Sequence, residues 1–249
     1  MDIAFRDRFL ELWEKHFDDT ELPISFYYTD EPAPLDPLPP AKGHACIMAQ
    51  LARVRKGQDL CFNIDSIGCF GGKKYLGFTH GTMPGFEYFL SYGIPGEMEG
   101  ERYKKTPEMV QEIMKNQPQC EAPARHIVFK RWDQLAEADQ PEVVIFLATP
   151  DVLSGLFTLS GFDETDSNAV IAPFGAGCAT IVQRPYVERE RERPRSVLGM
   201  LDVSARPYVP PDALSFATPM AKFRSMVDNM DESFLITKSW AKVRRRIHA

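Results

Sequence analysis

The sequence lacks the motifs that would assign a function directly. No two cysteines are separated by two residues, so the close-spaced signatures of zinc fingers, ferredoxins and thioredoxin-like proteins are absent. There is also no Walker loop, no G-x-G-x-x-G before a helix, no nucleophile elbow and no H-E-x-x-H. The sequence therefore does not indicate any of the common classes of nucleotide-binding proteins or hydrolases.

An excess of positive charge and long apolar runs are missing as well. The chain has 29 basic and 35 acidic residues, a net charge of -6, so we expect no nucleic-acid partner. No apolar run approaches the roughly 20 residues that span a bilayer, and the N-terminus has no apolar signal core. We expect no membrane partner, a cytoplasmic location and a small-molecule ligand, and the sequence leaves the oligomeric state open.

What the sequence does contain is a mixture of helical and strand patterns. With 249 residues and 44% hydrophobic residues, it can bury a full core. Apolar residues at three-and-four spacing predict a helix, and V-V-I-F-L-A is typical of a buried strand. Thr-Pro pairs indicate helix starts. The fold class is therefore mixed α/β, and the predicted elements include helices over 3–17, 46–54, 107–116, 150–159 and 217–230, an extended loop over 31–40, and strands over 24–28, 60–65, 75–78, 126–130 and 143–148.

Several signals recur in the same order in the two parts of the chain. The pairs are I-S-F-Y-Y-T-D-E-P with V-V-I-F-L-A-T-P-D, G-H-A-C with G-A-G-C, N-I-D-S with M-L-D-V, and two Thr-Pro helices. An internal duplication would explain this order. It predicts an N-terminal helix in 1–22 and two similar α/β halves, 23–125 and 126–249, each a small sheet covered by helices. We expect the halves to pack as one compact unit, with the ligand in the cleft between them.

Three of the five cysteines lie in positions that suit a bound cofactor. Cys46 and Cys178 follow glycine-containing turns and precede apolar helical runs, and a helix N-terminus favours thiolate over thiol. Cys69 lies in the glycine-rich S-I-G-C-F-G-G. Three such thiols suit a 4Fe-4S cluster with one iron left open, or a zinc ion with an open position. We expect Cys61 to be a packing residue of the core and Cys120 to be a loop residue with no partner.

Two other interpretations of the cysteines stay open. Free cysteine is among the most buried residue types, so the thiols can be packing residues of a metal-independent protein that binds a small molecule in a glycine-shaped pocket. Thiol redox chemistry is the third interpretation, and it requires two of the sulfurs to lie within disulfide reach.

Two histidines and two aspartates are further candidates for a pocket. His44, two residues before Cys46, reads as a fourth ligand, a proton donor, or simply a capping or solvated side chain. His80 lies in a glycine-rich loop. Asp65 and Asp202 end the strands that the duplication makes equivalent, where they either cap the following turns or face a central cleft.

A succession of short motifs along the chain resembles a known family. A G-x-x-C turn leads into a helix that ends in K-G, a strand leads to S-x-x-C and then L-G-F, V-V-I-F precedes a P-D helix, and G-C-A precedes a long loop. This order, from about Leu22 to Trp240, resembles the prokaryotic domain of unknown function 169 family. The resemblance aligns the family's cysteines with Cys46, Cys69 and Cys178 and implies a shared three-cysteine site, but it brings no accepted reaction.

Overall fold

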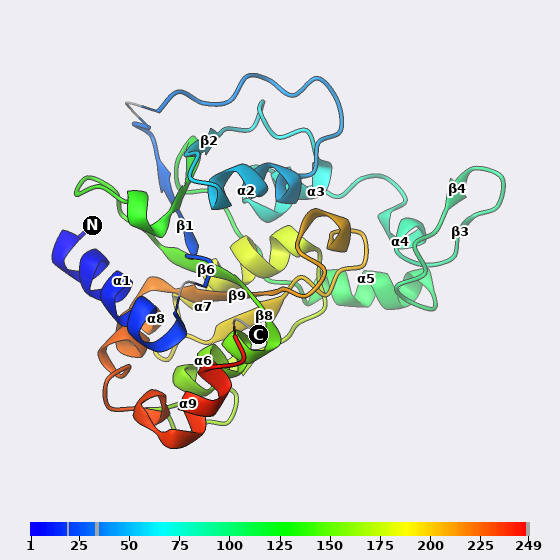
Figure 1. The fold of residues 1–249 in the computed structure, drawn as a ribbon. Helices are drawn as coiled ribbons and strands as arrows, with labels where there is room; N and C mark the ends of the chain where they lie inside the picture. The colour runs from blue at the N-terminus through cyan, green and yellow to red at the C-terminus, as the bar shows by residue number, and fades with distance from the viewer. Residues whose placement is uncertain (19, 33–34, 248–249) are drawn as a thin grey trace.

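A seven-stranded sheet runs through the protein, with the strand order β2-β5-β1-β6-β9-β8-β7 (Figure 1). The computed structural model describes residues 1–18, 20–32 and 35–247. Neighbouring strands are antiparallel except β7 and β8, which are parallel. The strands are β1 (Ile24–Thr29), β2 (Leu60–Phe62), β5 (His126–Arg131), β6 (Val143–Ala148), β7 (Val170–Ile171), β8 (Ser196–Gly199) and β9 (Leu214–Pro219).

Helices cover both faces of the sheet, so that it has a hydrophobic core on each side. Along β6, Val143 and Ile145 belong to one core, and Val144 and Phe146 belong to the other, because successive side chains of a strand point to opposite faces. The first core lies under α2 (Ile47–Arg55), α3 (Phe70–Tyr75), η2 (Ala179–Gln183) and α7 (Arg184–Glu188). The second lies under α1 (Ile3–Phe17), α6 (Pro150–Ser160), α8 (Met220–Asp228) and α9 (Lys238–Arg244) (Figure 1).

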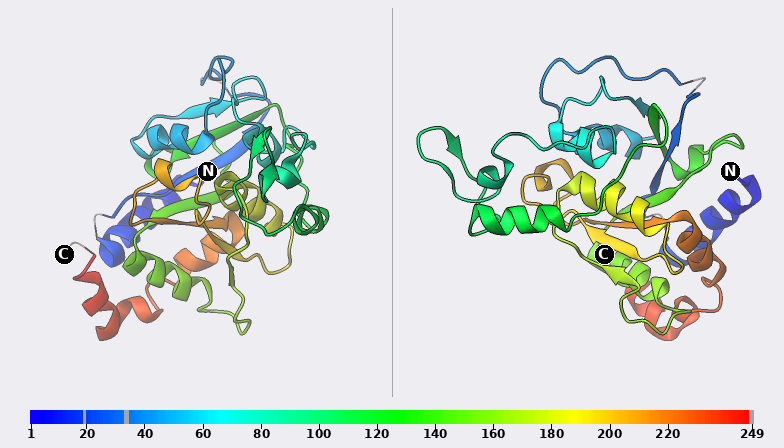
Figure 2. Two further views of the ribbon diagram at one scale, coloured as in Figure 1. Left: turned by 90° about the vertical axis from the view of Figure 1, so that its right-hand side faces the viewer. Right: turned by 180° about the vertical axis from the view of Figure 1, so that it is seen from behind.

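Between β2 and β5 the chain forms an arm that extends away from the sheet. Figure 2 shows this arm from two further sides. It consists of α4 (Phe86–Phe89), the hairpin of β3 (Gly93–Ile94) and β4 (Met98–Glu99), and α5 (Pro107–Lys115). Three 3-10 turns complete the described elements: η1 (Trp132–Gln134), η3 (Arg206–Tyr208) and η4 (Phe234–Ile236).

Many of the predicted elements are present. The helix predicted over 3–17 is α1, and its apolar stripe is buried in the second core. Thr106 accepts a hydrogen bond from the backbone N–H of Met109 and Pro107 begins α5, as the Thr-Pro signal predicts. The predicted 31–40 segment contains no helix or strand in its described part, and its residues 33–34 lie outside the described residues. The mixed α/β class is confirmed.

Three expectations were wrong. The segment 75–78 is no strand, since Tyr75 ends α3 and a turn follows. Residues 217–219 lie in β9 rather than in the helix predicted over 217–230, which begins at Met220. The strands of the two predicted halves do not form two small sheets, because β1 pairs directly with β6 and joins them into one.

The strand order has a symmetry that bears on the proposed duplication. β5 and β9 flank the central β1–β6 pair, and β2 and β8 lie next to them. Along the chain, α2 lies between β1 and β2, as η2 and α7 lie between β6 and β8. The two Thr-Pro helices do not correspond, because α5 precedes β5 whereas α8 follows β9. The duplication itself stays a prediction. In the part of the chain that the structure describes, no helix is long and apolar enough to cross a membrane.

Candidate functional site

Each of the three selected cysteines lies directly before the first residue of a different helix. Cys46 is the N-cap of α2, Cys69 is the N-cap of α3, and Cys178 directly precedes η2. The prediction that Cys46 and Cys178 lie at helix N-termini is therefore confirmed. For Cys69 the sequence predicted only an irregular turn, and the helix after it contains both Gly71 and Gly72.

The three thiols lie close enough to influence one another electrostatically. Burial raises the pKa of Cys178 far above its usual value, and negative charge on Cys69, Cys46 and Asp202 raises it further. Burial also raises the pKa of Cys46, the backbone N–H groups of Met48 and Ala49 lower it, and Cys69 and Asp202 again raise it. Because such effects fall off with distance, the thiols of Cys46, Cys69 and Cys178 form one group, called here the thiol cluster.

Close backbone contact brings the turn before Cys46 against the turn before Cys69. A Cβ atom added to Gly68 would lie only 2.2 Å from the carbonyl oxygen of Gly43 and 2.9 Å from the amide nitrogen of Ala45. The backbone N–H of Ala41 also donates to the carbonyl of Asp65, at 3.0 Å. Only glycine permits this approach, so Gly68 sets the distance between the first two turns of the cluster.

The turn after β8 holds the third cysteine in place. The backbone N–H of Gly177 donates to a carboxylate oxygen of Asp202 at 3.1 Å. The Thr180 hydroxyl donates to the Gly177 carbonyl at 2.9 Å and accepts from the Met200 N–H at 3.3 Å. Cys178 is consequently fixed at the start of η2, with only 8% of its surface exposed.

The two aspartates predicted for the pocket have different environments. Asp202 belongs to the thiol cluster electrostatically, and its other carboxylate oxygen accepts from the Ser204 N–H and hydroxyl at 3.1 and 2.9 Å. It therefore both caps a turn and faces the thiols, the two roles that the sequence left open. Asp65 is exposed, its backbone N–H donates to Asn63 at 3.1 Å, and it is not among the charges that shift the Cys46 or Cys178 pKa.

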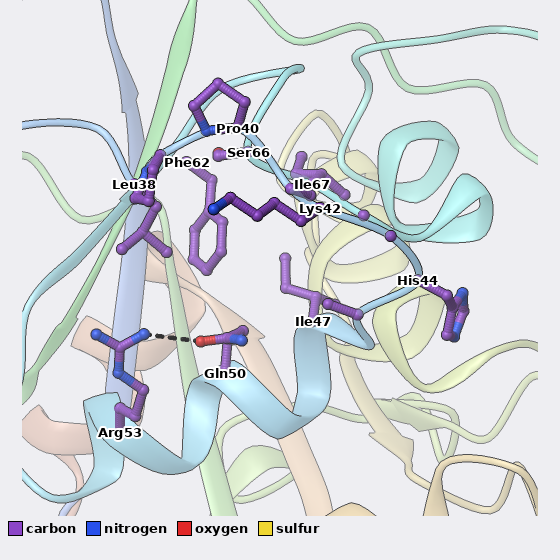
Figure 3. A pocket seen from close by; sticks show the side chains of 15 residues that line it. Leu38, Pro40, Lys42, His44, Ile47, Gln50, Arg53, Phe62, Ser66 and Ile67 are labelled. Carbon is purple, nitrogen blue, oxygen red and sulfur yellow. Dashed lines mark hydrogen bonds between the residues drawn. The ribbon is translucent and has the colours of Figure 1, made fainter.

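The two histidines lie outside the thiol cluster. His44 is exposed at the edge of a cavity, and Figure 3 shows its side chain directed away from the cavity interior. His80 is exposed in the loop after α3. Neither histidine is among the charges that shift the pKa of Cys46 or Cys178. The structure thus does not bring either of them to the thiols.

The sequence interpretation missed two residues here: Tyr75, which interacts with Cys178, and Arg184, which interacts with Tyr75. Burial raises the pKa of the Tyr75 hydroxyl to about 12, Cys178 and Asp202 raise it as well, and Gln117 and Arg184 lower it. Burial lowers the pKa of Arg184, against the opposing effect of Tyr75. Tyr75 was overlooked because its segment was expected to be a strand. Arg184 follows the π-helical η2, a kind of element that is frequent at functional sites.

The remaining two cysteines are packing residues. Cys61 is fully buried in β2, and burial raises its pKa to about 11, with a smaller contribution from Asp36. Cys120 is buried as well, and burial raises its pKa to about 11 while Arg189 and the Tyr28 hydroxyl lower it. Cys120 lies in a loop, as expected, but the expectation that it has no partner was wrong, since it packs in the first core beside the Tyr28 hydroxyl.

Exposed apolar side chains flank the turns of the thiol cluster. Phe70 follows Cys69, and Leu201 and Val203 enclose Asp202 in the sequence. The arm reaches the same region: the Tyr103 hydroxyl accepts from the Ser204 N–H at 3.2 Å, and Lys104 lies 4.1 Å from the ring centroid of the exposed Phe174. The surface next to the thiols is thus apolar, and the arm contacts it.

All five cysteines are free thiols. Within residues 1–18, 20–32 and 35–247, no group of three or more histidine, cysteine, aspartate or glutamate side chains is arranged to hold a metal ion. The thiol cluster therefore brings its three sulfurs near one another without forming a compact coordination shell for a single ion.

Comparison with known proteins identifies a family. The family described as Uncharacterised ArCR, the domain of unknown function 169, matches residues 15–229. The match includes every member of the thiol cluster, together with Tyr75, Arg184 and Asp202. No curated protein and no solved structure matches the chain. Since the match covers most of the sequence, the chain belongs to the domain of unknown function 169 family.

Proposed function

We propose that the thiol cluster binds a 4Fe-4S cluster through Cys46, Cys69 and Cys178, with one iron left without a cysteine ligand. The observation that carries this proposal is the position of the three thiols, each at the start of a separate helix and all within one electrostatically coupled group. Iron neutralises its thiolate ligands and so relieves the mutual repulsion that opposes ionisation of three neighbouring thiols.

We propose a cluster rather than a single metal ion. A zinc ion needs its ligands around one point, and the described residues contain no such compact group. A cubane cluster distributes its cysteines over separate iron atoms, so its ligand sulfurs lie farther apart. The backbone N–H groups at the starts of α2 and α3 also favour the negative charge of thiolates and cluster sulfides.

The groups around the thiols suit a substrate at the open iron. The Tyr75 hydroxyl lies near Cys178 and the Arg184 guanidinium lies near Tyr75, and they are a hydrogen-bond donor and a cation that an anionic substrate would contact. A cluster with an open iron supplies Lewis-acid chemistry or electron transfer. Five free thiols are typical of a reducing compartment, which supports the cytoplasm as the site of this chemistry.

Anaerobic purification followed by iron and sulfide analysis tests the proposal. We expect about four iron and four sulfide ions per chain after reconstitution, and an absorption band that bleaches on reduction. Cys46→Ser, Cys69→Ser and Cys178→Ser should each lose most of the iron. Cys61→Ala and Cys120→Ala are matched controls that should retain it, since both thiols lie in the core outside the cluster.

Two results would contradict the proposal. One is colourless protein after reconstitution, with iron below one ion per chain. The other is retention of iron in the triple variant of Cys46, Cys69 and Cys178. In either case the three cysteines are packing residues, and their substitution should change the free energy of unfolding without removing a cofactor.

A further inference from the structure

A cavity of about 310 Å³ lies behind the turns that lead to Cys46 and Cys69. Its walls are the 38–45 loop, the first turns of α2 and the segment from Phe62 to Gly68 (Figure 3). The volume lies at the lower end of the range of small-molecule sites, roughly 300 to 1,000 Å³. Ala45 and Gly68, which directly precede Cys46 and Cys69, belong to its lining.

The lining carries positive charge without negative charge. Lys42 and Arg53 both line the cavity, and no aspartate or glutamate is found among its described lining residues. Figure 3 shows the Lys42 side chain extended across the cavity and Arg53 at its other end, beside Gln50. Asp65, in the neighbouring turn, lies next to the lining residue Ser66 in sequence but is not itself part of the lining.

The Arg53 guanidinium is held in place by neutral partners. Its Nε donates to the side-chain oxygen of Gln58 at 2.9 Å, and one terminal nitrogen donates to that of Gln50 at 2.8 Å. These amides orient the guanidinium and leave its charge uncompensated. A cation positioned by neutral hydrogen bonds at the edge of a cavity is arranged to bind a carboxylate or a phosphate.

The cavity also has an apolar wall. Phe62, Ile47 and Ile67 are almost completely buried and present their side chains to it, together with Leu38 (Figure 3). An inorganic anion would contact the cations and leave this surface unused. A ligand with both an anionic group and an apolar body would contact both parts of the cavity.

We propose that this cavity binds a small organic anion, with a carboxylate or phosphate on Lys42 and Arg53 and an apolar body on Phe62 and Ile67. The site is separate from the thiol cluster and does not depend on a bound cofactor. Because Ala45 and Gly68 line the cavity and directly precede Cys46 and Cys69, the ligand would lie against the turns that position these two cysteines.

Calorimetric titration of the full chain with four compounds tests the charge and the apolar requirement together. The compounds are 3-phenylpropionate, phenyl phosphate, the neutral 3-phenylpropan-1-ol and inorganic phosphate. We expect at least one of the two aromatic anions to bind about tenfold more tightly than both the alcohol and inorganic phosphate, as one charge-assisted contact requires. The tighter of the two anions then assigns the headgroup as carboxylate or phosphate.

Variants connect the binding to the two cations. Lys42→Ala and Arg53→Gln should each weaken the aromatic anion about tenfold, whereas Arg53→Lys should weaken it less because the charge is kept. Lys56→Ala is the matched control, since Lys56 is an exposed lysine directly after α2 that does not line the cavity. Lys42 is exposed, so its substitution leaves folding intact and the test remains valid if Arg53 variants are unstable.

Three outcomes would overturn the proposal. They are no binding of either aromatic anion at millimolar concentration, equal binding of 3-phenylpropan-1-ol, and unchanged affinity in Lys42→Ala. The test is independent of the thiol cluster because none of these variants alters a cysteine. A chain that binds no iron but binds the anion would contradict the 4Fe-4S proposal alone.

Discussion

The backbone N–H of Gly177 donates a hydrogen bond to the carboxylate of Asp202 over 3.1 Å. This bond joins the residue before Cys178 to the turn after β8. Asp202 thereby fixes the buried thiol of the cluster through the main chain, while its charge faces that thiol. A hydrogen bond to a charged acceptor is worth about 1.5 kcal/mol or more when it is partly buried.

Asp202→Asn tests this connection. An asparagine that keeps its oxygen toward Ser204 turns its amide N–H toward Gly177, so the bond to Gly177 is lost. We expect the free energy of unfolding to fall by about 1.5 kcal/mol and the Gly177 amide to exchange hydrogen faster. Urea denaturation and amide exchange by NMR measure both effects. Asp65→Asn is the matched control, and an equal effect of that exposed substitution would contradict the assigned role.

Gly68→Ala should disturb the thiol cluster from the other side. The added Cβ would meet the Gly43 carbonyl at 2.2 Å and the Ala45 nitrogen at 2.9 Å, which are backbone atoms that cannot move aside without displacing the Cys46 turn. We expect a loss of about 3 kcal/mol in unfolding free energy, together with reduced iron content.

Gly71→Ala is the control for that substitution. Its Cβ would lie 3.7 Å or more from its neighbours, in α3, where alanine favours helix over glycine. We expect it to leave the stability unchanged or raise it by about 0.5 kcal/mol. Urea denaturation measures the unfolding free energy of both variants. Equal losses of stability would show that the close backbone approach at Gly68 does not cause the destabilisation.

Periodicity and capping signals were sufficient to predict the elements whose packing follows from their own sequence. The apolar spacing of residues 3–17 predicts α1, and Thr106 with Pro107 predicts the start of α5. The Thr218–Pro219 pair gives the same signal, yet both residues lie in β9, where Thr218 pairs with Val144 of β6. Sheet pairing there overrides the local preference, which a single sequence does not reveal.

Local sequence patterns also predicted only part of the candidate site. Glycine-containing turns before apolar runs predicted helix starts at Cys46 and Cys178, and both are present. Two glycines after Cys69 suggested a turn, but the segment folds into α3 and buries Tyr75 against the first core. The proximity of Cys46 and Cys69 depends on the contact of Gly68 with Gly43, a long-range contact that no local pattern contains.

Gly155→Ala should separate the helices of the second core. In α6, a Cβ at Gly155 would lie 2.5 Å from the Trp240 ring and 2.8 Å from the Phe17 ring. Trp240 cannot retreat freely, because its indole N–H donates to the His16 carbonyl at 2.8 Å. We expect a loss of about 2 kcal/mol, since overpacking outweighs the gain in helix propensity. Gly161→Ala, with its nearest atoms at 3.8 and 4.0 Å, should be neutral in the same thermal unfolding experiment.

Asp139 makes the stability of the fold depend on pH in the acid range. Burial raises the pKa of Asp139, but hydrogen bonds from the Tyr27 hydroxyl, the Ala136 N–H and Lys130 lower it, and the net pKa is below the usual aspartate value. These bonds measure 2.5, 2.7 and 2.9 Å. Because the pKa is lower in the folded state, the stabilisation is present above the unfolded pKa of about 3.9 and is lost as the pH falls through the folded value.

Asp139→Asn should therefore cost most at neutral pH. It leaves the nearly buried Lys130 with Asp59 alone, at 3.6 Å, so we expect a loss of about 3 kcal/mol at pH 7. The difference from the natural chain should narrow between pH 4 and pH 2, because protonation removes the same charge from Asp139 itself. Asp133→Asn breaks a more exposed ion pair with Arg131 and should cost about 0.5 kcal/mol. Urea denaturation across this pH range measures the unfolding free energies. If the difference between Asp139→Asn and the natural chain stays constant with pH, its effect is due to packing rather than to charge.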